Sequence, residues 1–222
     1  DMLTTAMKNG LEVFTDNELI NIKNDGDQVL AECKRETIKG QKAAICLGGD
    51  IEKFSDVKIK KSFAPIAVVK NVTADTNSFV ELDYFRKKCI NIITKEKSFG
   101  LIGGISLSKR EEVEEYFNFM INEHKKLNPK IEILDKYVGE KNEISLRKEN
   151  RNYLFHINSS SKYKNVWSVI PGKFTLAFSM APEFYRIIYK KNPKKFFKAY
   201  SDNGEYSDII DETVFGKFQQ KN

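Results

Sequence analysis

A strand–helix–strand pattern in the middle of the chain limits the fold more than any other feature. The apolar run "FGLIGGI" begins at Phe99, a helix with an apolar stripe is expected after Ser108, and Asn128-Pro129 ends that helix before "KIEILDKYV". Two strands joined by a helix are expected to run parallel through a right-handed crossover. We therefore predict an α/β fold with a mixed sheet and a central β-α-β unit over residues 99–138.

The flanking segments extend this prediction. Short apolar runs over residues 11–47 predict an N-terminal β-hairpin region, with Asp25-Gly26 as a tight turn. After residue 151, the runs "YLFHI", "VWSVI" and "FTLAF" predict strands, and Pro182 and Pro193 suit the first turns of two short helices. At 222 residues and 41% apolar content, a single α/β domain over residues 1–222 accommodates all of these elements.

A further helix is expected from Asn77 to Thr94. Ser78 and Glu81 have the spacing of a capping box, and the apolar residues after them recur at helical intervals. This helix precedes the central β-α-β unit, so the fold prediction has helical and strand segments on both sides of Phe99.

Basic charge is concentrated near the C-terminal end of the sequence. The whole chain carries a net charge of +6, yet residues 151–200 contain ten bases and the single acid Glu183. Twelve of the 26 aromatic residues lie in the same segment. An asymmetry of this kind informs about partners rather than fold.

Nucleic acid is the natural partner for such a segment, because lysines neutralise phosphates and exposed aromatic rings stack on bases. We therefore expect a nucleic-acid-binding protein that uses its basic, aromatic-rich C-terminal part. The residues expected to make the contacts are Lys162, Lys164, Trp167, Lys173, Arg186, Lys190, Lys191, Lys194, Lys195 and Lys198. The alternative is a solvated lysine face that the acidic segments 1–50 and 201–222 neutralise.

The pattern "NDGDQVLAECKRE" indicates a candidate catalytic site. Glu32 and Lys34 alternate on one face of an expected strand, and residues 12–50 resemble the hairpin of the PD-(D/E)xK nucleases. The resemblance implies that Glu32 and Asp16, or Glu18 in its place, hold Mg²⁺ and that Lys34 steadies the attacking hydroxide. Asp16, Glu32 and Lys34 are then catalytic residues of a metal-dependent phosphodiesterase. The alternative is an ion pair on an edge strand.

The glycines Gly100, Gly103 and Gly104 read G-x-x-G-G, which matches neither a dinucleotide-binding fingerprint nor a P-loop. Four glutamates, from Glu111 to Glu115, occupy the start of the following helix and would repel a phosphate. The glycines are therefore interpreted as a turn between strand and helix. Residues 77–142 also resemble the middle of the basic membrane protein family of nucleoside-binding lipoproteins, which implies a non-catalytic solute-binding lobe. A protein-interaction module is a third possibility.

Other features exclude several classes of protein. No run of eighteen apolar residues is present, and the first ten residues lack the pattern of a secretory signal, so a cytoplasmic location without a membrane span is expected. Three cysteines and two histidines have no spacing typical of a disulfide framework or a zinc site. Oligomeric state is left open.

Overall fold

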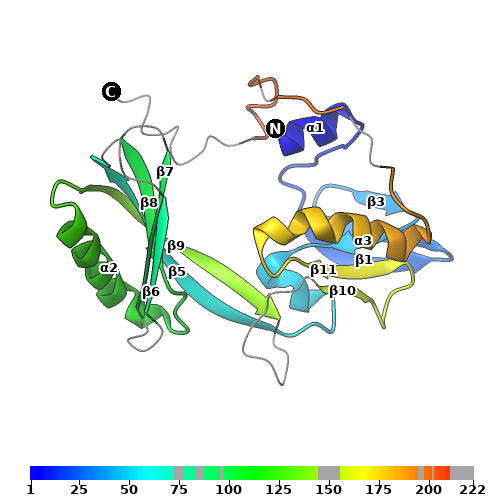
Figure 1. Cartoon of the computed structure of the whole chain (residues 1–222). Coiled ribbons are helices and arrows are strands. Elements are labelled where there is room, and N and C mark those ends of the chain that lie inside the picture. Colours follow the sequence, from blue (N-terminus) through cyan, green and yellow to red (C-terminus); the bar gives the residue numbers. More distant parts are fainter. Residues whose placement is uncertain are drawn as a thin grey trace. The chain divides into compact units, whose positions relative to one another are not determined.

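The computed structural model describes residues 1–72, 78–83, 88–95, 98–144, 156–194, 198–201 and 203–210. These residues form two compact units (Figure 1). The first unit comprises residues 1–60 and the described residues after 142, and the second comprises residues 61–142. No feature of the sequence marked this boundary, because the chain passes from one unit to the other within the long strands β5 and β9. The α/β class predicted from the sequence is confirmed.

The first unit contains two three-stranded sheets with a shared core. The antiparallel sheet has the order β1-β2-β3, and the other sheet has the order β10-β11-β4 with β11 and β4 parallel. Its core is formed by aliphatic residues such as Ile22, Ile51 and Val166. The elements are α1 Met2–Lys8, β1 Leu19–Asp25, β2 Gln28–Cys33, β3 Thr37–Gly40, β4 Ala43–Ile45, η1 Gly48–Lys53, β10 His156–Ser159, β11 Val166–Ile170, η3 Phe174–Leu176 and α3 Ala177–Tyr189.

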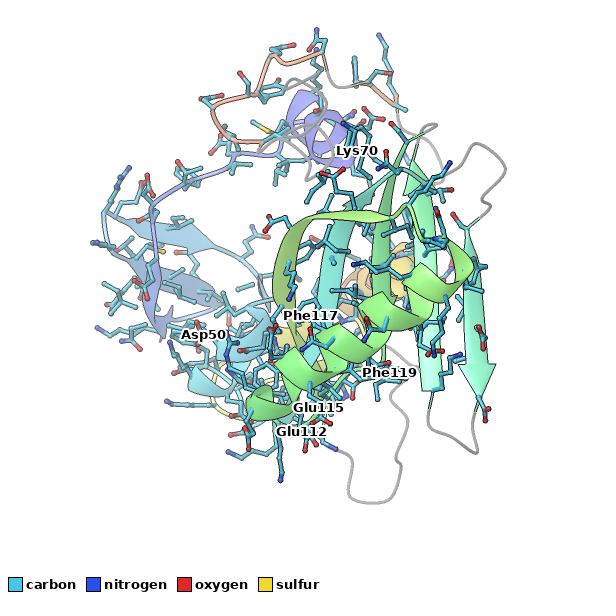
Figure 2. All side chains as sticks on the ribbon, turned by 90° about the vertical axis from the view of Figure 1, so that its left-hand side faces the viewer. Asp50, Lys70, Glu112, Glu115, Phe117 and Phe119 are labelled. Carbon is cyan, nitrogen blue, oxygen red and sulfur yellow. The ribbon has the colours of Figure 1, made fainter. Side chains whose placement is uncertain are left out.

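The second unit is a five-stranded sheet covered on one face by a helix, as Figure 2 shows. The strand order is β6-β7-β8-β5-β9. Phe117 and Met120 of the helix pack on Ile102 and its neighbours, whereas Phe119 points away and is 38% exposed. The elements are β5 Ile59–Lys70, β6 Phe79–Asp83, β7 Lys88–Lys95, β8 Phe99–Gly104, η2 Arg110–Glu112, α2 Val113–Leu127 and β9 Glu132–Ile144.

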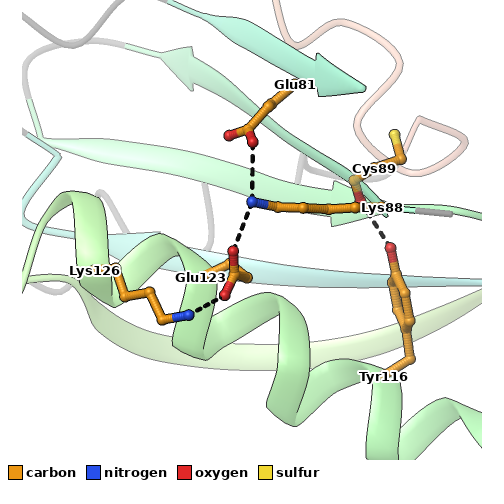
Figure 3. Close-up of polar contacts among 6 residues, drawn as sticks. All are labelled: Glu81, Lys88, Cys89, Tyr116, Glu123 and Lys126. Carbon is orange, nitrogen blue, oxygen red and sulfur yellow. Dashed lines mark hydrogen bonds and ion pairs between the residues drawn. The ribbon is translucent and has the colours of Figure 1, made fainter. Parts of the chain in front are cut away.

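Polar contacts also fix α2 on the sheet (Figure 3). The Tyr116 hydroxyl donates to the carbonyl oxygen of Cys89 at 2.7 Å and accepts from the Ile105 N–H at 3.1 Å. Lys88 Nζ lies 2.6 Å from Glu123 on the helix and 2.9 Å from Glu81 on β6. One helix face therefore contacts three points of the sheet by hydrogen bonds or ion pairs.

The predicted hairpin and the strand–helix–strand order are confirmed. Asp25 pairs with Gln28 across the turn of β1 and β2, and β8, α2 and β9 follow one another as expected. However, β8 and β9 are not hydrogen-bonded neighbours, because β5 lies between them and pairs antiparallel with β8. The crossover therefore spans an intervening strand.

The helix expected from Asn77 to Thr94 is wrong. Residues 79–83 and 88–95 are the antiparallel strands β6 and β7, and residues 84–87 lie outside the described part. Ile90 and Ile92 are buried on alternate positions, so the two-residue period of a strand overrode the helical spacing seen in the sequence. β-branched isoleucines also favour the extended backbone.

The C-terminal prediction is partly correct. The run "VWSVI" is β11, but "FTLAF" forms η3 and the start of α3 instead of a strand. Pro182 lies inside α3 rather than in its first turn, and residues 192–194 around Pro193 are not helical. No described helix is long and apolar enough to cross a membrane.

The three glycines lie inside β8 rather than in a turn. None of them has a positive φ, so backbone geometry does not require them. A Cβ at Gly100 would lie 3.2 Å from a Val72 methyl group, and one at Gly104 would lie 2.6 Å from Tyr116 Cε1 and 2.8 Å from the Cys89 oxygen. Close packing by neighbours therefore explains the glycines.

Candidate functional site

The residues expected to form a nuclease site make other contacts. Glu32 lies 2.6 Å from Lys23 Nζ and accepts a hydrogen bond from the Asn21 amide at 3.0 Å. These two contacts hold the pKa of the Glu32 carboxyl below its usual value. Asp16 lies 3.5 Å from Arg35 on the exposed surface. No group of three potential metal ligands occurs among the described residues.

Lys34 is placed by its backbone, whose N–H donates to the Glu18 carbonyl oxygen at 2.8 Å. Glu32 and Lys34 therefore sit at the end of an ordinary antiparallel ladder. Glu32 does make an ion pair, as the alternative expected, but its partner is Lys23 and β2 is the central strand of its sheet rather than an edge strand.

The basic residues after 150 are spread over several elements. Lys164 pairs with Asp27 of the β1–β2 turn, and Arg186 pairs with Glu183 on the same helix at 2.8 Å. Trp167 is half-buried, with its ring 6.3 Å from that of Phe184 in an edge-on arrangement, so it is not an exposed stacking platform.

The remaining basic residues have separate surroundings. Lys162 and Lys198 each lie 5.0 Å from a tyrosine ring centroid, and Lys190 ends α3 with a φ of 53°. Lys191 and Lys194 are exposed, Lys173 follows β11, and Lys195 lies outside the described residues.

A different site is formed where the parallel strands β4 and β11 end. Ser168 pairs with Ile45, so the two strands reach the same edge of the sheet together. A glycine follows each strand. Gly48, with a φ of +54°, follows β4, and the buried Gly172 follows β11. Ligands of open α/β sheets bind at the carboxyl ends of parallel strands.

The turn after β11 leads directly into η3 and α3. Only Pro171, Gly172 and Lys173 separate the strand from η3, so the amino end of the helical segment lies at the same edge. The first turn of α3 contains no acidic residue, and no side chain caps its amino end. About half a positive charge of the helix and the ammonium group of Lys173 therefore favour an anionic or electron-rich group there.

The amino end of α2 has the opposite character. Arg110–Glu112 and the first turn of α2 carry Glu111, Glu112, Glu114 and Glu115, and Figure 2 shows Glu112 and Glu115 at that end. Four carboxylates at this end repel a phosphate, as the sequence predicts. Of the two helices of eight or more described residues, only α3 begins in a positive environment.

The second unit presents an apolar surface on the sheet face opposite α2. Ile92 faces the helix, so the alternation of the strand directs Ile93 to the other side, where it is 57% exposed. Val80 and Leu82 of β6 share that side and are 63% and 56% exposed. Three large aliphatic side chains on one face are a surface for an apolar ligand or another polypeptide.

Sequence reasoning did not identify the β4–β11 edge. The available signal was that two apolar runs, "AAICLGG" and "VWSVIPG", each end in glycine. The run "VWSVI" was predicted as a strand, but its pairing with Ala43–Ile45 joins residues more than 120 positions apart, and no local pattern encodes it.

The chain matches no protein-family model, and no curated protein matches its sequence. Solved structures do share its fold. L-amino acid deaminase from Proteus vulgaris, lacking its specific insertion sequence, is 13% identical with a TM-score of 0.63, covering 86% of this chain and 50% of the deaminase. Iminodiacetate oxidase from Chelativorans sp. BNC1 is 9% identical with a TM-score of 0.63, covering 90% and 56%. The flavin-dependent brominase Bmp2 is 12% identical with a TM-score of 0.58, covering 86% and 55%.

These likenesses correct the functional expectations. Neither a PD-(D/E)xK nuclease nor a nucleoside-binding lipoprotein is among them, so both resemblances are wrong. The expectations of nucleic-acid binding, of cleavage by Asp16, Glu32 and Lys34, and of a solute-binding or interaction module are wrong with them. Mg²⁺ was implied only by the nuclease interpretation. The chain instead shares the fold of oxidases and flavin-dependent enzymes, and it spans about half their length.

Proposed function

We propose that this chain is part of a flavin-dependent oxidoreductase. The observation that carries the proposal is the likeness over 85% to 90% of the chain to enzymes named as a dehydrogenase, a deaminase and oxidases, together with flavin-dependent enzymes of the same fold. Likeness over this much of the chain includes elements of both units. Several of those names specify amino or imino acids, which favours a substrate with an oxidisable carbon–nitrogen bond.

The residues of the first unit fit the ring system of a flavin better than the pyrophosphate of a flavin dinucleotide. No G-x-G occurs anywhere in the 222 residues, so the glycine fingerprint that holds a dinucleotide pyrophosphate is not in this chain. The β4–β11 edge has what the ring system needs: turns with Gly48 and Gly172, and the uncapped amino end of the η3–α3 segment.

In this assignment the chain binds and orients the flavin ring and sets its charge environment. A bound flavin supplies hydride transfer. Lys173 and the amino end of α3 stabilise negative charge that develops on the ring when it is reduced. The glycines let the backbone approach the ring closely, because no Cβ intervenes.

The test is cofactor analysis of the native protein. An affinity tag is added to the chromosomal copy in the cells from which the sequence comes, and the purified protein is denatured to release any flavin for fluorescence detection after chromatography. We expect FAD or FMN in stoichiometric amount. Purified, folded protein that releases no flavin refutes the proposal.

A charge variant tests the assigned edge. Lys173→Gln is expected to lower flavin occupancy or make the bound flavin harder to reduce, because one positive charge is lost beside the ring. Lys164→Gln is the matched control, because Lys164 precedes β11 and pairs with Asp27 instead. Equal behaviour of the two variants contradicts the placement of the ring at Lys173.

A further inference from the structure

The strand β4 forms one border of its sheet. In the order β10-β11-β4 it pairs with β11 alone among the described strands, although Ile45 is only 3% exposed. The Ala43 N–H donates to the Asn165 carbonyl oxygen at 2.9 Å and so faces β11. Because N–H and C=O directions alternate along a strand, those of Ala44 point away from β11, toward the free edge.

An apolar groove lies along this edge. It has a volume of about 260 Å³ and is lined by Ala43 and Ala44 of β4 and by Ala181, Phe184, Tyr185 and Ile188 of α3, with Lys42 and Tyr189 beside them. None of the residues of α3 is fully buried, although its sequence "AFSMAPEFYRIIY" is largely apolar. Tyr185 and Tyr189 are 38% and 50% exposed.

Both features describe a sheet that can be extended. Parallel strands normally have neighbours on both sides and helices over their faces, so a parallel strand with a free edge beside a half-covered apolar helix is unusual. A further parallel strand at β4 would satisfy the Ala44 backbone groups. The helix that follows such a strand would cover apolar surface next to it.

The observations also indicate which segment fits. This chain covers only 50% to 56% of the length of enzymes that share its fold, and it has no G-x-G sequence. A β-α-β segment that carries G-x-G-x-x-G places its glycine turn at the carboxyl end of its first parallel strand. Paired with β4, that turn would lie at the same sheet edge as Gly48 and Gly172.

We propose that the free edge of β4 and the apolar face of α3 bind a β-α-β segment that lies outside these 222 residues and carries the dinucleotide-binding glycines. This inference rests on the proposed function, because it names the polypeptide that would complete the flavin site. It adds a specific surface, a strand direction and a partner with a recognisable sequence.

Site-specific photo-crosslinking in the native cells tests the inference. A benzoylphenylalanine residue replaces Tyr189 in the chromosomal copy, and the crosslinked peptides are identified by mass spectrometry. We expect a peptide from a predicted strand or helix flanking G-x-G-x-x-G, in whichever polypeptide carries it. The same residue at Ile20, which is 63% exposed on β1, is the control and is expected to give no such peptide.

Backbone variants test the strand pairing itself. Ala44→Pro removes the outward N–H and is expected to reduce that crosslink roughly tenfold, whereas Ala44→Val keeps the N–H and is expected to retain it. Ala181→Arg in α3 fills the groove without touching β4 and is expected to reduce the crosslink as well. Thermal unfolding of each variant shows that it is folded, and Ala181→Arg decides the question if Ala44→Pro is not.

Three results overturn the inference: crosslinks from Tyr189 to a second copy of this chain, crosslinks to peptides without the glycine fingerprint, or a yield no higher than at Ile20. Flavin content of the same preparations separates the two proposals. A fingerprint crosslink in protein without flavin refutes only the oxidoreductase proposal. Flavin-loaded protein without that crosslink refutes only the docking of the segment on β4.

Discussion

Replacing Gly104 by alanine should destabilise the second unit strongly, for a reason that is visible only in three dimensions. The added Cβ would lie 2.8 Å from the Cys89 carbonyl oxygen and 2.6 Å from Tyr116 Cε1, with the Tyr116 hydroxyl nearer still. Real Cβ atoms do not approach other atoms this closely. The Tyr116 ring therefore has to move away from the sheet, and backbone at Cys89 has to shift with it.

The magnitude follows from what the tyrosine loses. Its hydroxyl makes two hydrogen bonds, to Cys89 and from Ile105, and each contributes a net of about 1 kcal/mol. Overpacking of a close-packed site costs about 1–3 kcal/mol. Together, these terms mean that Gly104→Ala should lower the free energy of unfolding by about 3–5 kcal/mol, which for a chain of this size lowers the melting temperature by roughly 6–20 °C.

The assay is thermal and urea unfolding followed by circular dichroism, with two further variants. Gly139→Ala is the matched control, because Gly139 lies in a strand of the same sheet and its added Cβ would only contact Ala64, at 3.8 Å or more. It should change the melting temperature by no more than about 2 °C. Gly104→Ala should also cost less when Tyr116 is already alanine, because the ring is then absent.

Equal stability of the Gly104 and Gly139 variants would contradict the packing argument. A Gly104→Ala cost that is unchanged in the Tyr116→Ala background would show that the tyrosine is not responsible for it.

Three further measurements address other contacts. Burial lowers the pKa of His124, so below about pH 6.5 the unfolded chain binds a proton at this residue more readily than the folded chain does. The contribution of His124 to stability should therefore be complete above about pH 6.5 and should decrease below it. His124→Gln should make the melting temperature depend less on pH between about pH 7 and pH 5. Hydrogen bonds from Lys126 and Lys88 hold the pKa of the Glu123 carboxyl at about 2, so the stability that Glu123 contributes should be lost as the pH falls from about 4.5 toward 2. Glu123→Gln should remove this decrease in melting temperature at acid pH. An unchanged decrease in the variant would show that Glu123 is not its cause. Trp167→Ala should lower the unfolding free energy by about 2 kcal/mol in urea titrations, since the ring is half-buried against α3, and a change within 0.5 kcal/mol, roughly the level of a surface substitution, would refute that packing.

The elements predicted correctly from the sequence are those whose signals are local. Asp25-Gly26 marks a hairpin because the turn needs a residue with positive φ, and Gly26 has a φ of +58°. The helix after Ser108 was predictable because its buried residues, such as Val113 and Phe117, recur on one face. Asn128 ends the helix as the sequence indicates.

The failures arise where contacts between distant residues decide the structure. Leu82, Cys89 and Ile92 are spaced as on a helix, yet the pairing of β7 with β8 and the packing of α2 fix them in strands. The lysines after residue 150 form one cluster in sequence, but folding brings Lys164 to Asp27. The composition of residues 79–95 and of residues 151–200 does not predict these long-range contacts.

The candidate site was invisible for a related reason. The sheet edge near Gly48 and Gly172 exists only because Ala43–Ile45 pairs with Val166–Ser168, and parallel pairing leaves no turn signature between the strands. A pattern search can find a dinucleotide-binding fingerprint only when the sequence contains one, and this sequence contains no G-x-G.

The Thr5 side chain near the start of the chain makes two hydrogen bonds of the kind that the backbone of a neighbouring strand makes. The Thr5 hydroxyl donates to the Tyr200 carbonyl oxygen and accepts from the Tyr200 N–H, both at 3.0 Å, and the Asn9 amide donates to the Lys198 oxygen at 3.1 Å. The Thr5 hydroxyl therefore satisfies both backbone groups of Tyr200, as a paired strand would. Because both bonds meet at one oxygen atom, α1 and residues 198–200 should open and close together, and their amide protons should exchange with solvent at a common rate.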